Sequence, residues 1–274
     1  MADIWSYEGK RALVVGCYSG IGEATARELV RLGAEVHGID YRPTDQPLAS
    51  FSLCDLRERA QIDAAMDALP GEIDALFYCA GLPQTSPAID VIKVNFLSAR
   101  YLIEQAIPRF SAGSAVAVIA STAGNGFPER FATVMELATS ADYDAGLAWA
   151  EPRLAELGDP YMFSKEVVIV WGFRVSNHLI KQGIRLNLLS PGPTFSGMTK
   201  DFEAVSSARI IDVYTQPLGR RSSPEEQAYP LIFLNSSAAS YINGCNFIAD
   251  AGFTAGMATG QIDLERLLKQ AIAA

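Results

Sequence analysis

The sequence contains no long apolar run, no basic cluster and no signal-peptide layout in its first residues. None of its apolar stretches is long enough to cross a bilayer, and the start, MADIWSYEGKR, lacks a charged segment followed by an apolar one. Basic residues are scattered over a chain whose net charge is −9, which argues against a nucleic-acid or anionic-membrane surface. We therefore expect a cytoplasmic protein with no nucleic-acid and no membrane partner.

Residues that ligate metals are also sparse. The four cysteines lie far apart and form no Cys-x-x-Cys pair, so we expect free thiols in a reducing compartment rather than a disulfide frame or a zinc site. The two histidines, His37 and His178, lie inside a strand-like and a helix-like run, which favours structural roles. The sequence therefore predicts no metal.

Short apolar runs alternate with helical patterns along the whole chain, and 49% of the residues are hydrophobic. The runs lack polar alternation, which is typical of strands buried on both faces of a parallel sheet. No linker or repeat divides the chain. The sequence predicts one α/β domain, residues 1–274, with a Rossmann-type, doubly wound parallel sheet and helices on both faces. The expected strands are 11–16, 34–40, 73–81, 114–120, 184–190 and 244–250, and the expected helices are 21–33, 57–69, 91–110, 161–183 and 224–235.

Two segments depart from this alternation. Residues 122–160 carry helical patterns broken by glycine and proline, and residues 193–218 form a long excursion after a strand end. In doubly wound folds ligands bind outside the carboxyl ends of the strands, so we expect both segments at the functional edge. The tail, residues 261–274, is amphipathic and predicts a helix that docks on the domain or on a partner.

A glycine-rich turn, VVGCYSGIG, lies between the first strand and the first helix. Gly16 permits a tight turn, Gly20 lets the backbone approach a pyrophosphate, and Gly22 lets helix and strand pack closely. The helix N-terminus would then offer free N–H groups to phosphates. A glycine-rich turn without a ligand is the alternative, which the strand–turn–helix context disfavours.

The end of the second strand bears on the choice of dinucleotide. Asp40 can accept hydrogen bonds from both ribose hydroxyls of an adenosine and would repel a 2′-phosphate. Ser19 stands before Gly20, where a basic residue might have held that phosphate. Arg42 points the other way, but it lies two residues past the strand and is expected to be solvated. The sequence predicts NAD rather than NADP.

With these pieces placed, the chain resembles the short-chain dehydrogenase/reductase family over nearly its full length. The glycine spacing matches the family's Gly-x-x-x-Gly-x-Gly. Each motif alone is weak, but all of them in order at compatible spacing are specific. The further matches are CDL at 54–56, YCAG at 78–81, VNF with Asn95, IAST at 119–122, YMFSK at 161–165 and SPGPT at 190–194.

The chain departs from the family pattern at a few positions. Val15 stands where the family usually has Thr, and Tyr78 and Cys79 replace two Asn residues. These changes should affect hydrogen bonds between strand and loop more than chemistry. IAST offers two hydroxyls, of which we assign Ser121, with Thr122 as the alternative.

The largest departure is the long gap between Ser121 and Tyr161. Together with CAG and GLPQT after the third strand, this helical insertion looks most like the bacterial 3α-hydroxysteroid dehydrogenase/carbonyl reductase subgroup, a pattern that coniferyl-alcohol dehydrogenase-like proteins share. In that subgroup the insertion covers helices that other members use for tetramer assembly. The resemblance therefore implies a homodimer, with a tetramer as the alternative.

The resemblance also implies a reaction, hydride transfer between an alcohol carbon and a nicotinamide. Tyr161 would take the hydroxyl proton, although a free tyrosine, with a pKa near ~10, is too weak a base at neutral pH. Lys165, one helical turn away on the same face, would favour the phenolate and lower that pKa. Ser121 would hydrogen-bond the substrate oxygen, and Asn95 would hold a water linking Lys165 to solvent.

The residues carried over from the family form two sets. Lys165 would also hold the nicotinamide ribose, and Pro191, Gly192 and Thr194 would bind the carboxamide. The implied catalytic residues are Ser121, Tyr161, Lys165 and Asn95. The implied cofactor-binding residues are Gly16, Ser19, Gly20, Ile21, Gly22, Asp40, Tyr41, Asp55, Leu56, Cys79, Ala80, Gly81, Tyr161, Lys165, Pro191, Gly192 and Thr194.

The excursion 193–218 bears on the substrate. It is rich in apolar residues and has no basic cluster to hold a carboxylate or phosphate, so we expect a lid over a bulky apolar alcohol or ketone, such as a steroid, terpene or aromatic compound. An amphipathic helix merely packed on the body is the alternative. Two other functions stay open. An NADPH-preferring carbonyl reductase is disfavoured by Asp40, and a non-catalytic nucleotide-binding sensor should have a broken Ser/Tyr/Lys set.

Overall fold

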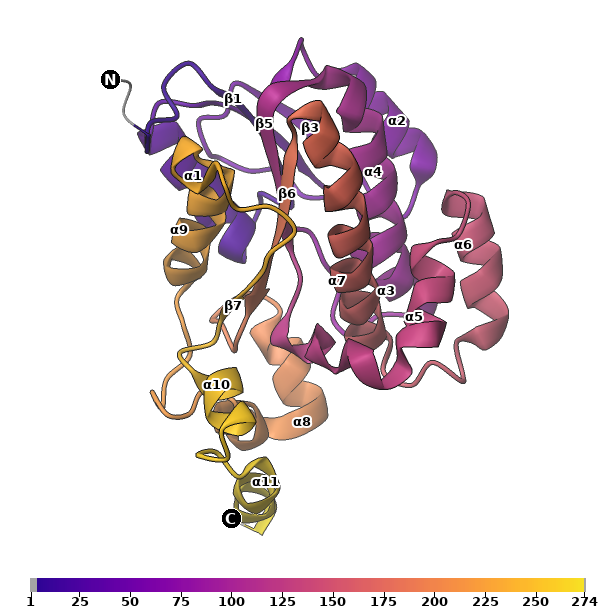
Figure 1. Cartoon of the computed structure of the whole chain (residues 1–274), viewed down its shortest axis with the longest axis vertical. Helices are drawn as coiled ribbons and strands as arrows, with labels where there is room; N and C mark the ends of the chain where they lie inside the picture. Colours follow the sequence, from indigo (N-terminus) through magenta and orange to yellow (C-terminus); the bar gives the residue numbers. More distant parts are fainter. Residues whose placement is uncertain (1–3, 274) are drawn as a thin grey trace.

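Seven parallel strands form one sheet in the computed structural model, which describes residues 4–273 (Figure 1). The strand order is β3-β2-β1-β4-β5-β6-β7, so the chain builds outward from β1 in one direction and from β4 in the other. The predicted doubly wound α/β fold is confirmed. The strands are β1 (Arg11–Val15), β2 (Glu35–Asp40), β3 (Ser50–Leu53), β4 (Ile73–Tyr78), β5 (Phe110–Ile119), β6 (Arg185–Pro191) and β7 (Asn246–Ala249).

Helices cover both faces of the sheet, as the left and right sides of Figure 1 show. Each face encloses its own apolar core between helices and strands. The helices are α1 (Gly20–Arg31) and α9 (Pro224–Asn235) on one face, and α2 (Arg59–Asp67), α3 (Ala88–Ile92), α4 (Ser98–Ala106) and α7 (Pro160–Leu179) on the other.

Strand β1 shows why the strands lack polar alternation. Leu13 and Val15 belong to the core beneath α2, α4 and α7. Ala12 and Val14 belong to the core beneath α1 and α9. Because successive side chains of a strand point to opposite faces, a strand covered on both sides needs an apolar residue at every position.

Strand β3 was missed by the sequence patterns. Its four residues alternate serine with an apolar residue, and Leu53 at its end is 65% exposed. It is the edge strand of the sheet, paired only with β2 among the described strands. A short, half-exposed edge strand gives little apolar signal, so only the pairing identifies it.

The predicted helix 91–110 is confirmed as a continuous helical segment, residues 88–109, but it contains a π-helical turn that the sequence did not indicate. α3 ends at Ile92, a π-helical turn spans Lys93–Leu97, α4 follows, and β5 already begins at Phe110. π-Helical turns leave a backbone carbonyl out of the regular pattern and often occur at functional sites. Here the buried hydroxyl of Tyr78 donates to the carbonyl of Val94 at 2.6 Å.

The segment 122–160 forms a layer outside α7 and α4. A 3-10 segment (Thr122–Arg130) is followed by α5 (Phe131–Ala138) and α6 (Tyr143–Ala150). The Arg100 side chain, from α4, donates to the carbonyls of Ser140 and Ala141 at 2.7 and 3.1 Å. The insertion thus buries the outward side of α4.

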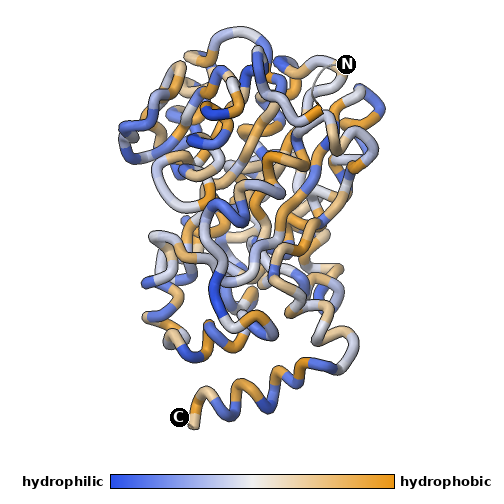
Figure 2. The backbone as a smooth tube through the Cα atoms, turned by 90° about the vertical axis from the view of Figure 1, so that its left-hand side faces the viewer, coloured by the Kyte–Doolittle hydropathy of each residue, from blue (hydrophilic) through white to orange (hydrophobic). Residues whose placement is uncertain are grey.

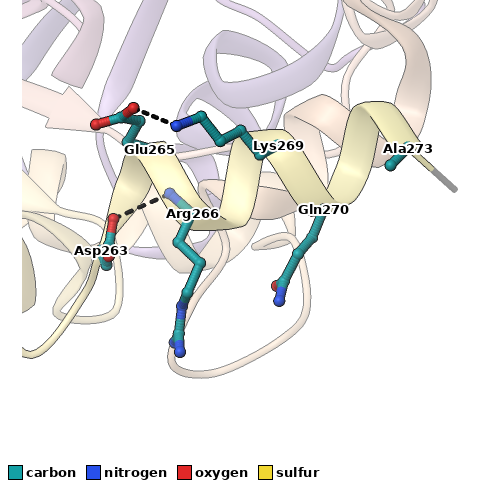
Figure 3. A pocket seen from close by; sticks show the side chains of 6 residues that line it. All are labelled: Asp263, Glu265, Arg266, Lys269, Gln270 and Ala273. Carbon is teal, nitrogen blue, oxygen red and sulfur yellow. Dashed lines mark hydrogen bonds and ion pairs between the residues drawn. The ribbon is translucent and has the colours of Figure 1, made fainter.

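Three helices from the C-terminal third of the chain lie at one end of the sheet: α8 (Thr199–Val213), α10 (Phe253–Ala258) and α11 (Leu264–Ala273). α11 stands out from the body, as Figure 2 shows, and packs on α8. Its outward side carries a shallow groove, lined by Asp263, Glu265, Arg266, Lys269, Gln270 and Ala273 (Figure 3). Lys269 pairs with Glu265 within the helix, and Asp263 accepts the backbone amide of Arg266 at 2.9 Å.

Among the helices of residues 4–273, none is both long and apolar enough to cross a membrane. Over the same part of the chain no three His, Cys, Asp or Glu side chains are grouped so that they could hold a metal ion.

We predict that the Tyr78→Phe substitution lowers the free energy of unfolding by about 1–3 kcal/mol, because it leaves the buried carbonyl of Val94 without its donor. Equilibrium urea denaturation followed by tryptophan fluorescence measures this change. Tyr241→Phe, at a fully exposed side chain, is the matched control and should leave stability unchanged. Equal stability of the two variants would contradict a role for the Tyr78 hydroxyl in holding the π-helical turn.

Candidate active site

The carboxyl ends of four neighbouring strands bring the predicted residues to one edge of the sheet. The glycine-rich turn follows β1, and Cys79–Gly81 follow β4. Ser121 comes two residues after the end of β5, and Pro191 is the last residue of β6. This edge includes the point where the strand order changes direction, the usual ligand site of a doubly wound sheet.

The turn after β1 has no room for a side chain at Gly16 or at Gly22. Gly16 has a φ of +86°, and a Cβ there would lie 2.5 Å from the amide nitrogen of Ala80. A Cβ at Gly22 would lie 1.9 Å from the Gly16 carbonyl oxygen. α1 then begins at Gly20, and in the described structure the Ser19 side chain caps none of its amides. The first-turn N–H groups are therefore left for an anionic ligand such as a diphosphate.

Asp40 is the last residue of β2, beside this turn, and is 6% exposed. Its carboxylate accepts hydrogen bonds from the amides of Tyr18 and Arg42 at 2.9 and 3.1 Å. Burial raises the pKa of Asp40, and these backbone donors oppose the rise. The Arg42 guanidinium, expected to be solvated, lies over the rings of Tyr41 and Tyr18 at 5.1 and 5.5 Å.

Three of the predicted cofactor-binding residues, Asp55, Leu56 and Cys79, differ in how freely they could contact a ligand. The Asp55 carboxylate is paired with Arg57, with Nη2 to Oδ2 at 2.6 Å, and this partner lowers the pKa of Asp55. Leu56 is buried, and its carbonyl accepts the Ser98 hydroxyl at 2.5 Å. The thiol of Cys79 is buried with a raised pKa, which makes it a packing group rather than a nucleophile.

The Tyr161–Lys165 pair lies in the first turn of α7. Asp159 caps the helix, its carboxylate accepting the amides of Tyr161 and Met162 at 2.8 and 3.0 Å. Lys165 Nζ lies 5.6 Å from the centre of the Tyr161 ring and donates to the carbonyl of Ile119, at the end of β5, at 2.9 Å. Burial lowers the pKa of Lys165 to about 8.

The structure separates the two hydroxyls of IAST. Ser121 lies near enough to Tyr161 that hydrogen bonding between them lowers the pKa of that phenol. The Ser121 oxygen also accepts the amide of Ala123 at 3.2 Å. The Thr122 hydroxyl instead donates to the carbonyl of Pro191 at 3.2 Å. Ser121 is therefore the hydroxyl that faces the tyrosine.

The expected lowering of the Tyr161 pKa is not found in the protein alone. Burial raises this pKa above its ordinary value, and the hydrogen bond from Ser121 opposes only part of the rise. Phe202 contributes to the burial, since its ring lies 5.1 Å from that of Tyr161 at an interplanar angle of 71°. A phenolate at neutral pH therefore needs positive charge beyond that of Lys165.

Asn95 lies in the π-helical turn, and its side chain bonds to two segments. Nδ2 donates to the Leu82 carbonyl and the Ser164 hydroxyl, both at 3.0 Å, and Oδ1 accepts the Leu82 amide at 2.7 Å. Ser164 in turn donates to the carbonyl of Tyr161 at 2.7 Å. Sequence reasoning missed Ser164, although it stands inside YMFSK three residues after Tyr161. The predicted water contact of Asn95 stays a prediction.

The loop after β6 is tightly packed and makes an internal hydrogen bond. A Cβ at Gly192 would lie 3.0 Å from the Cα of Asp250, and the Thr194 hydroxyl donates to the Gly192 carbonyl at 3.0 Å. Two other predicted residues lie elsewhere at this edge. Ile21 lies in the first turn of α1, and Tyr41 follows β2 with a largely exposed side chain.

The lid, residues 193–218, lies over this edge. Phe202 packs on Tyr161, and the methyl carbon of Met198 lies 3.9 Å from the place a Cβ of Gly81 would take. Other apolar residues of the lid face away, since Phe195 and Val205 are 56% and 58% exposed. The lid therefore turns only some of its apolar residues toward the site.

This arrangement can support proton transfer at a bound hydroxyl. A phenol, a buried ammonium and a serine hydroxyl meet beneath an apolar roof, and a turn with free amides lies on the neighbouring strand end. The donor set fits a dinucleotide whose diphosphate lies at α1 and whose reactive end lies near Tyr161.

Two family models match the chain. One described as short chain dehydrogenase matches residues 10–133, and one described as Enoyl-(Acyl carrier protein) reductase matches residues 150–254. A coniferyl-alcohol dehydrogenase of Pseudomonas sp. strain HR199 is 30% identical over 244 residues, with 89% of this chain and 96% of that protein covered. A 3-alpha-hydroxysteroid dehydrogenase/carbonyl reductase of Comamonas testosteroni is 30% identical over 250 residues, with the same coverage, 89% and 96%.

Solved structures share the fold. The 3-alpha-hydroxysteroid dehydrogenase from Pseudomonas sp. B-0831, complexed with NADH, has a TM-score of 0.77 and 25% identity, with 93% of this chain and 100% of that chain covered. A putative 2-deoxy-d-gluconate 3-dehydrogenase from Agrobacterium tumefaciens, with bound NADP, has a TM-score of 0.68 and 23% identity, with 92% and 99% covered.

The lowered pKa of Lys165 predicts a pH dependence of stability in the ligand-free protein. Between about pH 8 and the ordinary lysine value of 10.5, the folded protein has lost this proton while the unfolded chain still binds it. The lysine's contribution to stability is therefore unfavourable below pH 8 and improves as the pH rises through this window. Urea denaturation of the wild type and Lys165→Met should show the difference in free energy shifting toward the wild type with rising pH. A constant difference would contradict the prediction.

Proposed function

The chain belongs to the short-chain dehydrogenase/reductase family, and on this premise we propose that it is an NAD-dependent dehydrogenase that interconverts a bulky apolar secondary or allylic alcohol and its carbonyl compound. Members of this family bind a nicotinamide cofactor, and the named relatives are dehydrogenases. The observation that carries the proposal is the meeting of Tyr161, Lys165 and Ser121 beneath the lid.

The chain's own residues divide the chemical work. Ser121 donates a hydrogen bond to the alcohol oxygen and keeps it beside Tyr161, which takes the hydroxyl proton. Lys165 holds the nicotinamide ribose and adds positive charge near the phenol. A bound nicotinamide supplies the hydride acceptor, or the donor in the reductive direction. Asn95 positions α7 through Ser164.

Cofactor binding follows from the strand ends. Gly16, Gly20 and Gly22 let the diphosphate approach the N-terminus of α1, where amides are free. The segment from Pro191 to Thr194 lies at the end of β6, where it would hold the carboxamide.

The preference for NAD rests on charge. The carboxylate of Asp40, fixed by two backbone amides, would accept the ribose hydroxyls and repel a 2′-phosphate. Arg42, held over two tyrosine rings, is the feature that favours the alternative, an NADPH-preferring carbonyl reductase. The related structures include one with NADH and one with NADP.

The substrate class follows from the lid. Phe202 and Met198 present apolar surface near Tyr161 and Gly81, which suits a steroid, terpene or aromatic alcohol better than a sugar. We further propose that the protein acts in the cytoplasm, where its four free cysteines stay reduced. A homodimer is proposed because the insertion covers the outer side of α4 and α7.

The direct test is a screen of the purified protein at 340 nm with NAD and a panel of apolar secondary and allylic alcohols. We expect turnover with at least one member, and a fall in kcat of several orders of magnitude for Tyr161→Phe while NADH still binds. NADH binding is followed by its fluorescence. Near-normal turnover of Tyr161→Phe would remove the tyrosine as the base. Clear NADH binding with no turnover across the panel would favour the non-catalytic sensor.

Replacing Asp40 with alanine should shift the cofactor preference. Because the carboxylate repels a 2′-phosphate, we expect Asp40→Ala to change the ratio of kcat/KM for NAD over NADP by about 10- to 100-fold in favour of NADP. Asp45→Ala removes an exposed carboxylate from the same loop and serves as the control. An unchanged ratio in Asp40→Ala would contradict the charge argument.

A further inference from the structure

A buried arginine just beyond the lid has no part in the chemistry described above. Arg221 is 7% exposed. Its Nε donates to Asp212 Oδ1 at 2.7 Å and its Nη1 to Glu203 Oε1 at 2.6 Å. Both carboxylates belong to α8, near its two ends, so the guanidinium joins the beginning of this helix to its end.

Two further contacts of Arg221 extend this connection. Nη2 donates to the Ala208 carbonyl at 3.4 Å, and the guanidinium carbon lies 5.7 Å from the centre of the Phe195 ring. Ser207, next to Ala208, interrupts α8 with a φ of 59°. A helix broken in this way has no continuous backbone ladder across the break. Arg221 therefore holds together the two halves of α8 and the strand-like start of the lid.

Hydrogen bonds close the base of the lid next to Arg221. The Ser222 amide donates to the Pro193 carbonyl at 3.0 Å, and the Phe195 amide donates to the Ser222 carbonyl at 2.9 Å. The hydroxyls of Thr194 and Ser222 lie 2.8 Å apart. The lid is thus a loop closed at its base, with Arg221 beside the closure.

The position of the lid matters because it contacts both halves of the proposed site. Phe202 packs on Tyr161. At the other side, a Cβ of Gly20 would lie 3.4 Å from the Cβ of Ser196, a lid residue facing the glycine-rich turn. A change in the lid's shape would therefore alter the roof over the phenol and over the cofactor turn together.

We propose that Arg221 is a positioning residue that holds the lid as one rigid body, with Phe202 against Tyr161 and Ser196 over the glycine-rich turn. The planar fork of arginine spreads five N–H donors over three nitrogens and so reaches two carboxylates and a carbonyl in different directions, whereas the three donors of a lysine share one nitrogen. The identity of the cofactor and substrate beneath the lid rests on the proposed function, whereas the rigidity of the lid does not depend on it.

The neighbouring residue supplies a matched control. Arg220 has a half-exposed side chain that pairs with Glu226 of α9, at 2.7 Å. Its guanidinium also donates to the Arg221 carbonyl at 3.2 Å, and within the described residues it bonds to no residue of 193–218. Arg220→Met and Arg221→Met each remove one arginine, one positive charge and one trypsin site from adjacent positions. Only the second should free the lid.

Limited trypsin digestion followed by mass spectrometry tests the proposal without a substrate. Lys200 and Arg209 are exposed sites within the lid, and cleavage there requires local opening. We expect Arg221→Met to be cut after these residues about 10-fold faster or more than Arg220→Met, because a buried guanidinium with two carboxylates has been removed. Equal rates of cleavage in the two variants would overturn the proposal.

Two further measurements separate positioning from general destabilisation. Cleavage after Lys181, an exposed site outside the lid, should be equally slow in both variants, whereas global unfolding would accelerate it as well and count against the proposal. Stopped-flow fluorescence should show NADH leaving Arg221→Met several-fold faster than Arg220→Met. If Arg221→Met does not fold, Glu203→Gln, which removes one partner only, should show the same lid-specific cleavage, and its absence there would overturn the proposal.

The outcome is distinguishable from a failure of the proposed function. Accelerated lid cleavage in a protein without dehydrogenase activity would leave the Arg221 inference standing and contradict the function. An active dehydrogenase whose lid cleavage and NADH release are the same in both variants would contradict the inference alone.

Discussion

The hydrogen bond from Lys165 Nζ to the carbonyl of Ile119 fixes the geometry on which the site depends. A buried ammonium is stable only with a close acceptor, and this acceptor is the last residue of β5. The bond therefore holds the first turn of α7 against the strand end that leads to Ser121, and Tyr161 is brought to the same point. Asn95 adds a second attachment through Ser164, so the start of α7 is held by one strand end and by the π-helical turn.

Burial then disfavours the charged form of both Tyr161 and Lys165. It raises the pKa of Tyr161 and lowers that of Lys165, because a low-dielectric site disfavours the phenolate and the ammonium alike. The apolar lid that suits a bulky substrate is one source of this burial, since Phe202 lies on the Tyr161 ring. The apolar contact of the lid with Tyr161 thus also means that ionising this tyrosine needs added positive charge.

The two excursions are built differently. The insertion between Ser121 and Tyr161 is fixed to the body by long arginine side chains, with Arg100 bonded to Ser140 and Ala141 and Arg130 paired with the buried Glu166 of α7. In the lid, the ion pairs of α8 run instead to Arg221, just beyond the lid's base. A bond to the body is made by Asp201, which accepts the Thr85 hydroxyl at 3.0 Å.

The sequence by itself determined what depends on local periodicity and spacing. Unbroken apolar runs such as Leu13 to Val15 required a sheet covered on both faces, the glycine spacing from Gly16 to Gly22 required a tight turn before a helix, and a spacing of four put Tyr161 and Lys165 on one helical face. Only the tertiary structure decided the pairing of the edge strand β3, the π-helical turn held by Tyr78, the direction of the Tyr161 pKa shift and the partners of Arg221. These features arise from contacts between segments far apart in the chain, which packing selects and no local pattern records.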